Sequence, residues 1–94
     1  MTATESLTHR LLAWLPKNLA PREVRVLCEA KVERLTSGFW NTTIDGQAII
    51  DTTEGAVKRL LRYWTRRGIL DQAMSSLHRP EQWAAQEEGD PLGR

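Results

Sequence analysis

The sequence has too few cysteine and histidine residues for several common kinds of site. Cys28 is the only cysteine, which excludes an intramolecular disulfide, and His9 and His78 do not make a spaced ligand set for structural zinc. The chain also lacks a supported Ser/His/Asp or Cys/His set, a glycine-rich phosphate loop and a carboxylate pair in an apolar setting. We therefore expect a protein that is not an enzyme and that has no cofactor or metal.

Long hydrophobic runs are absent as well. No apolar stretch approaches the roughly 18 residues of a membrane-spanning helix, and the N-terminus, with Glu5 and no cationic start, does not resemble a signal peptide. The 94 residues are 40% hydrophobic and 27% charged, which is typical of one small globular domain. These features predict a cytoplasmic protein without a membrane partner.

The net charge of +1 is small, but its distribution along the chain is uneven. Residues 1–50 carry six basic and five acidic side chains, and residues 71–94 carry two basic and five acidic ones. Residues 51–70 carry five basic and only two acidic side chains. Positive charge is therefore concentrated in one segment and negative charge in the C-terminal segment, which favours an anionic partner for residues 51–70.

The clearest helical pattern spans residues 53–67. Apolar residues recur there at positions i, i+3, i+4 and i+7, namely Val57, Leu60, Leu61 and Trp64. Thr53 suits the N-cap, and Gly68 suits the left-handed residue that ends many helices. The opposite face is cationic, with Lys58, Arg59, Arg62 and Arg66. Such a helix can pack against a core and contact an anion, although a basic outer face is also compatible with simple solvation.

About residues 52–70 resemble the recognition helix of winged helix-turn-helix DNA-binding domains, chiefly in the run Ala-Val-Lys-Arg-Leu-Leu-Arg-Tyr-Trp-Thr-Arg-Arg-Gly-Ile-Leu at 56–70. In that family a small residue and Val open the helix, Leu and a second large apolar residue bury it, and Arg-Gly-Ile-Leu leads out. The resemblance implies a mainly α fold, a small helix-turn-helix (winged-helix-like) domain with at most one short β-hairpin.

The same resemblance implies a transcriptional regulator that binds double-stranded DNA, with the basic helix in the major groove. The residues expected to face DNA are Thr53, Glu54, Gly55, Lys58, Arg59, Arg62 and Arg66. Among them Arg59 and Arg62, near the middle of the exposed side, are expected to carry most of the affinity and to matter little for folding. We also expect a homodimer through the terminal helices that carry Trp14 and Trp83.

Apolar periodicity together with proline and glycine positions predicts three more helices. They are expected near residues 5–15, 21–36 and 80–87. In this interpretation residues 1–87 form a single domain, and residues 88–94 are a polar, disordered tail.

Residues 39–51 leave two structures open. The first is a short helix, in which Gly46 would cost about 1 kcal/mol. The second is a β-hairpin with strands near 39–44 and 47–51, because Asp45-Gly46 is among the most favourable two-residue hairpin turns. Beyond Leu70 there is no turn signal for a full wing.

A second class of function does not require DNA. Four tryptophans in so short a chain favour an interface, and the surface outside residues 51–70 has mixed charge. The protein would then be a protein-binding adaptor or inhibitor, for example a phage- or plasmid-type protein that blocks a host nucleic-acid machine in the manner of anti-CRISPR proteins. The aromatic residues expected at that interface are Trp14, Trp40, Tyr63 and Trp83.

Overall fold

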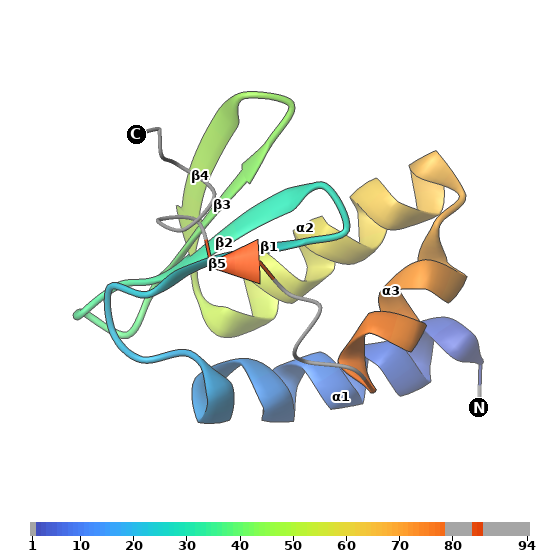
Figure 1. The fold of residues 1–94 in the computed structure, drawn as a ribbon, viewed down its shortest axis with the longest axis horizontal. Helices are drawn as coiled ribbons and strands as arrows, with labels where there is room; N and C mark the ends of the chain where they lie inside the picture. The colour runs from blue at the N-terminus through green and yellow to red at the C-terminus, as the bar shows by residue number, and fades with distance from the viewer. Residues whose placement is uncertain (1, 79–83, 86–94) are drawn as a thin grey trace.

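The computed structural model describes residues 2–78 and 84–85, and these form three helices and an antiparallel sheet (Figure 1). In chain order the elements are α1 (Ala3–Asn18), β1 (Val24–Leu27), β2 (Ala30–Arg34), β3 (Trp40–Ile44), β4 (Gln47–Asp51), α2 (Thr53–Arg67), α3 (Leu70–Leu77) and β5 (Ala84–Ala85). The strand order is β4-β3-β2-β1-β5. The protein has an α+β fold, so the predicted mainly α helix-turn-helix domain with at most one hairpin is wrong.

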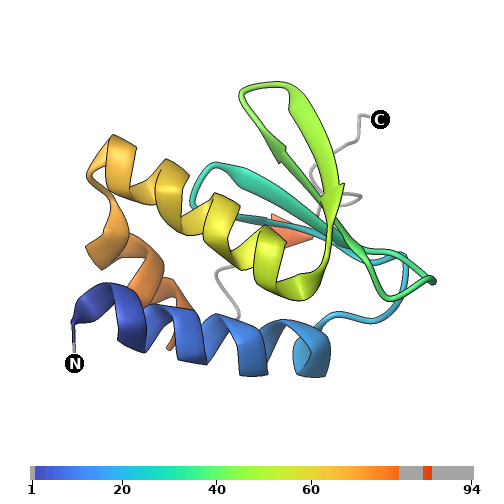
Figure 2. The same ribbon diagram turned by 180° about the vertical axis from the view of Figure 1, so that it is seen from behind.

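The helices lie on one side of the sheet, where α2 packs on β3 and β4 while α1 and α3 pack against α2 (Figures 1 and 2). Side chains alternate along the central strands, as expected for a sheet with one covered face. Val32 of β2 and Trp40, Thr42 and Ile44 of β3 point into the core. The core is completed by the apolar faces of α1 and α2, including Leu11, Leu15, Leu60 and Trp64, none of them more than 1% exposed.

The helix predicted at 21–36 is a second correction, because these residues form the hairpin of β1 and β2. Leu27 pairs with Ala30, so Cys28 and Glu29 make a two-residue turn, with φ of 47° and 72°. The prediction failed because the apolar residues in this segment are spaced three or four apart as well as at alternate positions. Cys-Glu also gives no turn signal, since hairpins of this kind favour Asn-Gly or Asp-Gly.

The hairpin alternative for residues 39–51 is confirmed, and the helical alternative is wrong. β3 and β4 pair from Trp40↔Asp51 to Ile44↔Gln47. Asp45 and Gly46 form the turn with φ of 53° and 80°, which is the type I′ geometry that favours Asp-Gly. A hairpin therefore stands where a helix-turn-helix domain would place the helix before its recognition helix.

The helix predicted at 53–67 is confirmed as α2, and its ends have the expected chemistry with one change. The N-cap is Thr52 and not Thr53, since Thr52 Oγ1 accepts a hydrogen bond from the Gly55 amide at 3.1 Å. Gly68 ends the helix with φ of 71°. Residues 70–77, for which no wing was expected, form α3.

The first helix is confirmed but extends past Pro16 to Asn18. Its C-terminal carbonyls are held by the sheet, because Arg34 Nη1 donates to the carbonyl oxygens of Pro16 and Leu19 at 2.9 and 2.8 Å. The helix predicted at 80–87 falls outside the described residues except for Ala84–Ala85, which pair with β1 as a strand. The predicted tail at 88–94 also falls outside them.

Candidate nucleic-acid interface

The outer surface of α2 carries a row of three cations. Lys58, Arg62 and Arg66 are spaced four residues apart and are all exposed. At 1.5 Å per residue the row is about 12 Å long. These three side chains form no ion pair with the described residues, whereas Arg67, on a neighbouring face, pairs with Glu29 at 3.0 Å. Like charges four residues apart destabilise a helix, so the row concentrates positive potential at a cost in stability.

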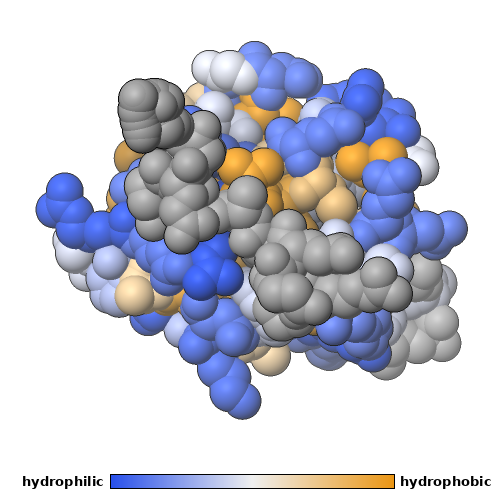
Figure 3. Space-filling model, in the orientation of Figure 1, coloured by the Kyte–Doolittle hydropathy of each residue, from blue (hydrophilic) through white to orange (hydrophobic). Residues whose placement is uncertain are grey.

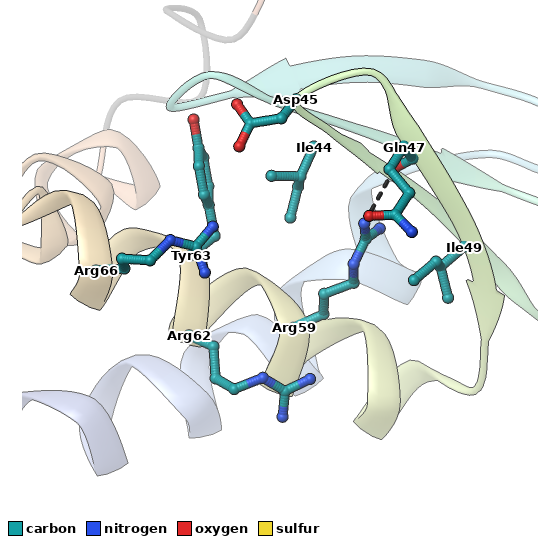
Figure 4. Close-up of a pocket in the computed structure, with 8 residues that line it drawn as sticks. All are labelled: Ile44, Asp45, Gln47, Ile49, Arg59, Arg62, Tyr63 and Arg66. Carbon is teal, nitrogen blue, oxygen red and sulfur yellow. Dashed lines mark hydrogen bonds between the residues drawn. The ribbon is translucent and has the colours of Figure 1, made fainter.

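A pocket of about 210 Å³ lies beside this row, between α2 and the β3–β4 hairpin (Figure 4). It is lined by Ile44, Asp45, Gln47, Ile49, Arg59, Arg62, Tyr63 and Arg66. Arg62 extends away from the hairpin in Figure 4, whereas the Arg66 guanidinium lies over the Tyr63 ring at 5.6 Å. This cation–π contact places Arg66 at the rim of the pocket. The pocket therefore has apolar and polar walls with cations along one side.

Arg59 does not belong to the exposed row, although it was expected to face DNA. Its Nη1 donates to the carbonyl and hydroxyl oxygens of Thr42, the hydroxyl at 2.7 Å, and its Nη2 donates to the carbonyl oxygen of Gln47 at 3.0 Å. Partial burial lowers the pKa of Arg59, and the neighbouring charge of Arg62 lowers it further. Arg59 thus ties α2 to the hairpin, and the expectation that it matters little for folding does not fit this geometry.

Two other predicted contact residues also have partners inside the fold. Thr53 Oγ1 accepts a hydrogen bond from Trp40 Nε1 at 2.7 Å. Gly55 is packed against the Asp51 carboxylate, which occupies the position that a Cβ atom would take. Glu54 is exposed in the first turn of α2. The solvent-facing part of the predicted site is therefore Glu54 together with Lys58, Arg62 and Arg66.

Two of the four residues of the predicted aromatic interface belong to the core. Trp40 is 1% exposed and Tyr63 is 4% exposed, whereas Trp14 is half-buried against the core. Trp83 lies outside the described residues. In the described part of the chain the large exposed apolar side chains are Phe39, Ile49 and Ile50, and two of these belong to β4. On the face of the molecule drawn in Figure 3, hydrophobic surface forms small patches between hydrophilic residues. The exposure of Ile49 and Ile50 follows from the position of β4 at the edge of the sheet, which the hairpin pattern alone does not give.

The residues described by the structure do not contain a cluster of three or more His, Cys, Asp or Glu side chains that could hold a metal ion. In the same part of the chain, no helix has the length and apolar character needed to cross a membrane. No protein-family model, curated protein or solved structure matches this chain.

Proposed function

We propose that this protein binds double-stranded DNA through the outer surface of α2 and acts as a small transcriptional regulator. The observation that carries the proposal is the exposed row of Lys58, Arg62 and Arg66. Phosphate contacts are made by such cations and supply most of the affinity of sequence-independent binding. Because a hairpin replaces the helix that would precede a recognition helix, we assign these side chains to phosphates first and to base edges second.

The expected strength of binding follows from the number of contacts. Each neutralised phosphate contributes about −0.9 to the slope of log affinity against log salt, so a row of three gives a slope near −3 per chain. Binding that rests on phosphates alone has dissociation constants of about 10⁻⁴ to 10⁻⁶ M at physiological salt. A single copy would therefore bind weakly and with strong salt dependence.

A mobility-shift titration on duplex DNA at several salt concentrations tests this proposal. We expect Arg62→Ala and Lys58→Ala each to lower the salt slope by about one. Folding should change by no more than about 0.5 kcal/mol, because both side chains are exposed. The matched control is Lys17→Ala, which removes the same charge from an exposed position on α1 and should leave the slope unchanged.

The triple change Lys58→Ala, Arg62→Ala and Arg66→Ala is the decisive variant. A folded triple variant that keeps the DNA affinity and the salt slope of the natural chain would show that the row is only a solvated surface. Arg59→Ala is unsuitable for this purpose, because it would remove hydrogen bonds to the sheet together with the charge.

A second candidate function is supported by a different observation. For a protein-binding adaptor or inhibitor, two residues of the expected aromatic interface, Trp40 and Tyr63, are buried. The supporting observation is strand β4, whose outer edge pairs with none of the described residues and whose Ile50 is 61% exposed. An extended segment of another protein could pair with such a strand. Retention of biological effect by the triple variant, without DNA binding, would favour this second function.

A further inference from the structure

Strand β4 forms one edge of the sheet, and none of the described residues pairs with its outer side. All five of its residues, Gln47–Asp51, are exposed, including Ile49 at 39% and Ile50 at 61%. Edge strands are usually protected by lysine, proline or a bulge. β4 contains neither lysine nor proline, and its register with β3 runs without interruption. The strand therefore presents an unprotected edge for pairing.

The register shows which backbone groups face that edge. In a two-residue hairpin the residues flanking the turn, here Ile44 and Gln47, form a hydrogen-bonded pair, and such pairs alternate along the ladder. Gln47, Ile49 and Asp51 therefore direct their backbone groups towards β3. Ala48 and Ile50 direct their N–H and C=O groups away from β3, towards the free edge.

We propose that β4 pairs antiparallel with β4 of a second copy of this chain, with the two-fold axis at Ile49. In this register Ala48 lies opposite Ile50 of the second copy, and both pairs of outward-facing backbone groups are satisfied. Ile49 lies opposite Ile49 of the second copy, and Gln47 lies opposite Asp51. The exposed isoleucines are covered, and an amide stands opposite a carboxylate at each end of the paired segment.

Two neighbouring registers would keep the same backbone groups at the interface, but they place less favourable residues opposite each other. Shifting the axis to Ala48 would place Asp45 opposite Asp51 of the second copy, and like charges directly opposite are destabilising. Shifting the axis to Ile50 would place Gln47 opposite Thr53, which already belongs to α2 and cannot pair as a strand. The sequence of β4 is thus self-complementary in one antiparallel register, which favours a second copy as the occupant of the edge.

Pairing at this edge would also affect DNA binding by α2. This consequence rests on the proposed function, whereas the pairing itself does not. Ile49 lies on the side of the sheet that faces α2, since it lines the pocket with Arg62 and Arg66 (Figure 4). A continuous sheet therefore places the α2 helices of both copies on the same side. The two rows of cations would act on one DNA molecule, and the salt slope of the dimer would be about twice that of one chain.

Sedimentation equilibrium of the full chain without DNA tests the pairing. We expect a concentration-dependent dimer, and we expect Ile50→Lys to weaken it by about tenfold or more, because lysine on an edge opposes pairing. The control Ala13→Lys adds the same charge at an exposed position on α1, close to Trp14, and should leave the dimer intact. A dimer lost in Ala13→Lys but kept in Ile50→Lys would place the interface on the terminal helices and overturn the proposal.

A charge-swap experiment tests the register itself. Ala48→Glu alone should weaken the dimer, because it places two carboxylates at the interface. Combining Ala48→Glu with Ile50→Lys puts each lysine opposite a glutamate of the second copy and should restore most of the dimer. A double variant that stays as dissociated as Ile50→Lys, or a natural chain that is monomeric at every concentration, would overturn the proposal. These measurements contain no DNA, so a failure to form the dimer would not count against the proposed DNA binding.

Discussion

The two β-hairpins have the same geometry but reach it in different ways. Both have two-residue turns in which both residues have positive φ, Cys28-Glu29 in the first and Asp45-Gly46 in the second. A left-handed conformation costs a non-glycine residue about 1–2 kcal/mol, with Asn and Asp less disfavoured. The residues of the second turn therefore favour its left-handed conformation, whereas those of the first turn disfavour the conformation that they adopt.

Contacts from α2 account for the first turn. Trp64 Nε1 donates to the Cys28 carbonyl at 3.0 Å, and the Tyr63 hydroxyl donates to the Glu29 carboxylate at 3.0 Å. Arg67 forms an ion pair with the same carboxylate at 3.0 Å. The second hairpin is held along its strands and not at its turn, through Arg59. Local sequence is sufficient for one hairpin, and the other depends on the tertiary structure.

The largest expected effect concerns Trp64, which contacts the turn of the first hairpin. Trp64→Ala removes a fully buried ring and the donor to Cys28, so we expect a loss of about 3–5 kcal/mol in the free energy of unfolding. In the second hairpin, Arg59→Ala should cost less, about 1.5–3 kcal/mol, because it removes charged hydrogen bonds without leaving a large cavity. Urea unfolding measures both. A larger loss of stability for Arg59→Ala than for Trp64→Ala would contradict this ranking.

A smaller effect is expected at the turns themselves. Gly46→Ala should destabilise the protein by about 1–2 kcal/mol. There is space for a Cβ atom at this position, but φ of 80° is unfavourable for alanine. The matched change in the first turn, Glu29→Gly, relieves a strained residue but removes the contacts with Tyr63 and Arg67. We therefore expect it to change the urea midpoint less than Gly46→Ala does. Equal losses at both positions would contradict the distinction between the turns.

The smallest effect is a dependence on pH that arises at the turn of the first hairpin. The hydrogen bond from Tyr63, and then that from Arg67, lowers the pKa of Glu29 below its ordinary value. A carboxylate with a lowered pKa in the folded state stabilises the protein above its unfolded pKa and loses this contribution as the pH falls. The urea midpoint should therefore decrease as the pH is lowered from about 5 to about 3. Glu29→Gln should reduce that fall; a fall of unchanged size in Glu29→Gln would show that Glu29 is not its source.

The sequence alone determined the elements whose signals are local. Helix α2 has an apolar face of period 3.6 and caps at both ends, so it was predicted. Asp45-Gly46 favours its turn through its own φ preferences, which made the hairpin one of the two alternatives for residues 39–51. The concentration of cations on α2 was also visible. In each case the residues that carry the signal are the residues that form the structure.

The tertiary structure decided the rest. Residues 21–36 have apolar spacing compatible with a helix, and they form a hairpin because Trp64, Tyr63 and Arg67, far along the chain, hold the Cys28-Glu29 turn. Arg59 and Arg62 look alike in the sequence, and only the position of the β3–β4 hairpin binds one to the sheet and leaves the other exposed. Local patterns give the propensity of a segment, whereas packing between distant segments selects which propensity is realised and which charges meet solvent.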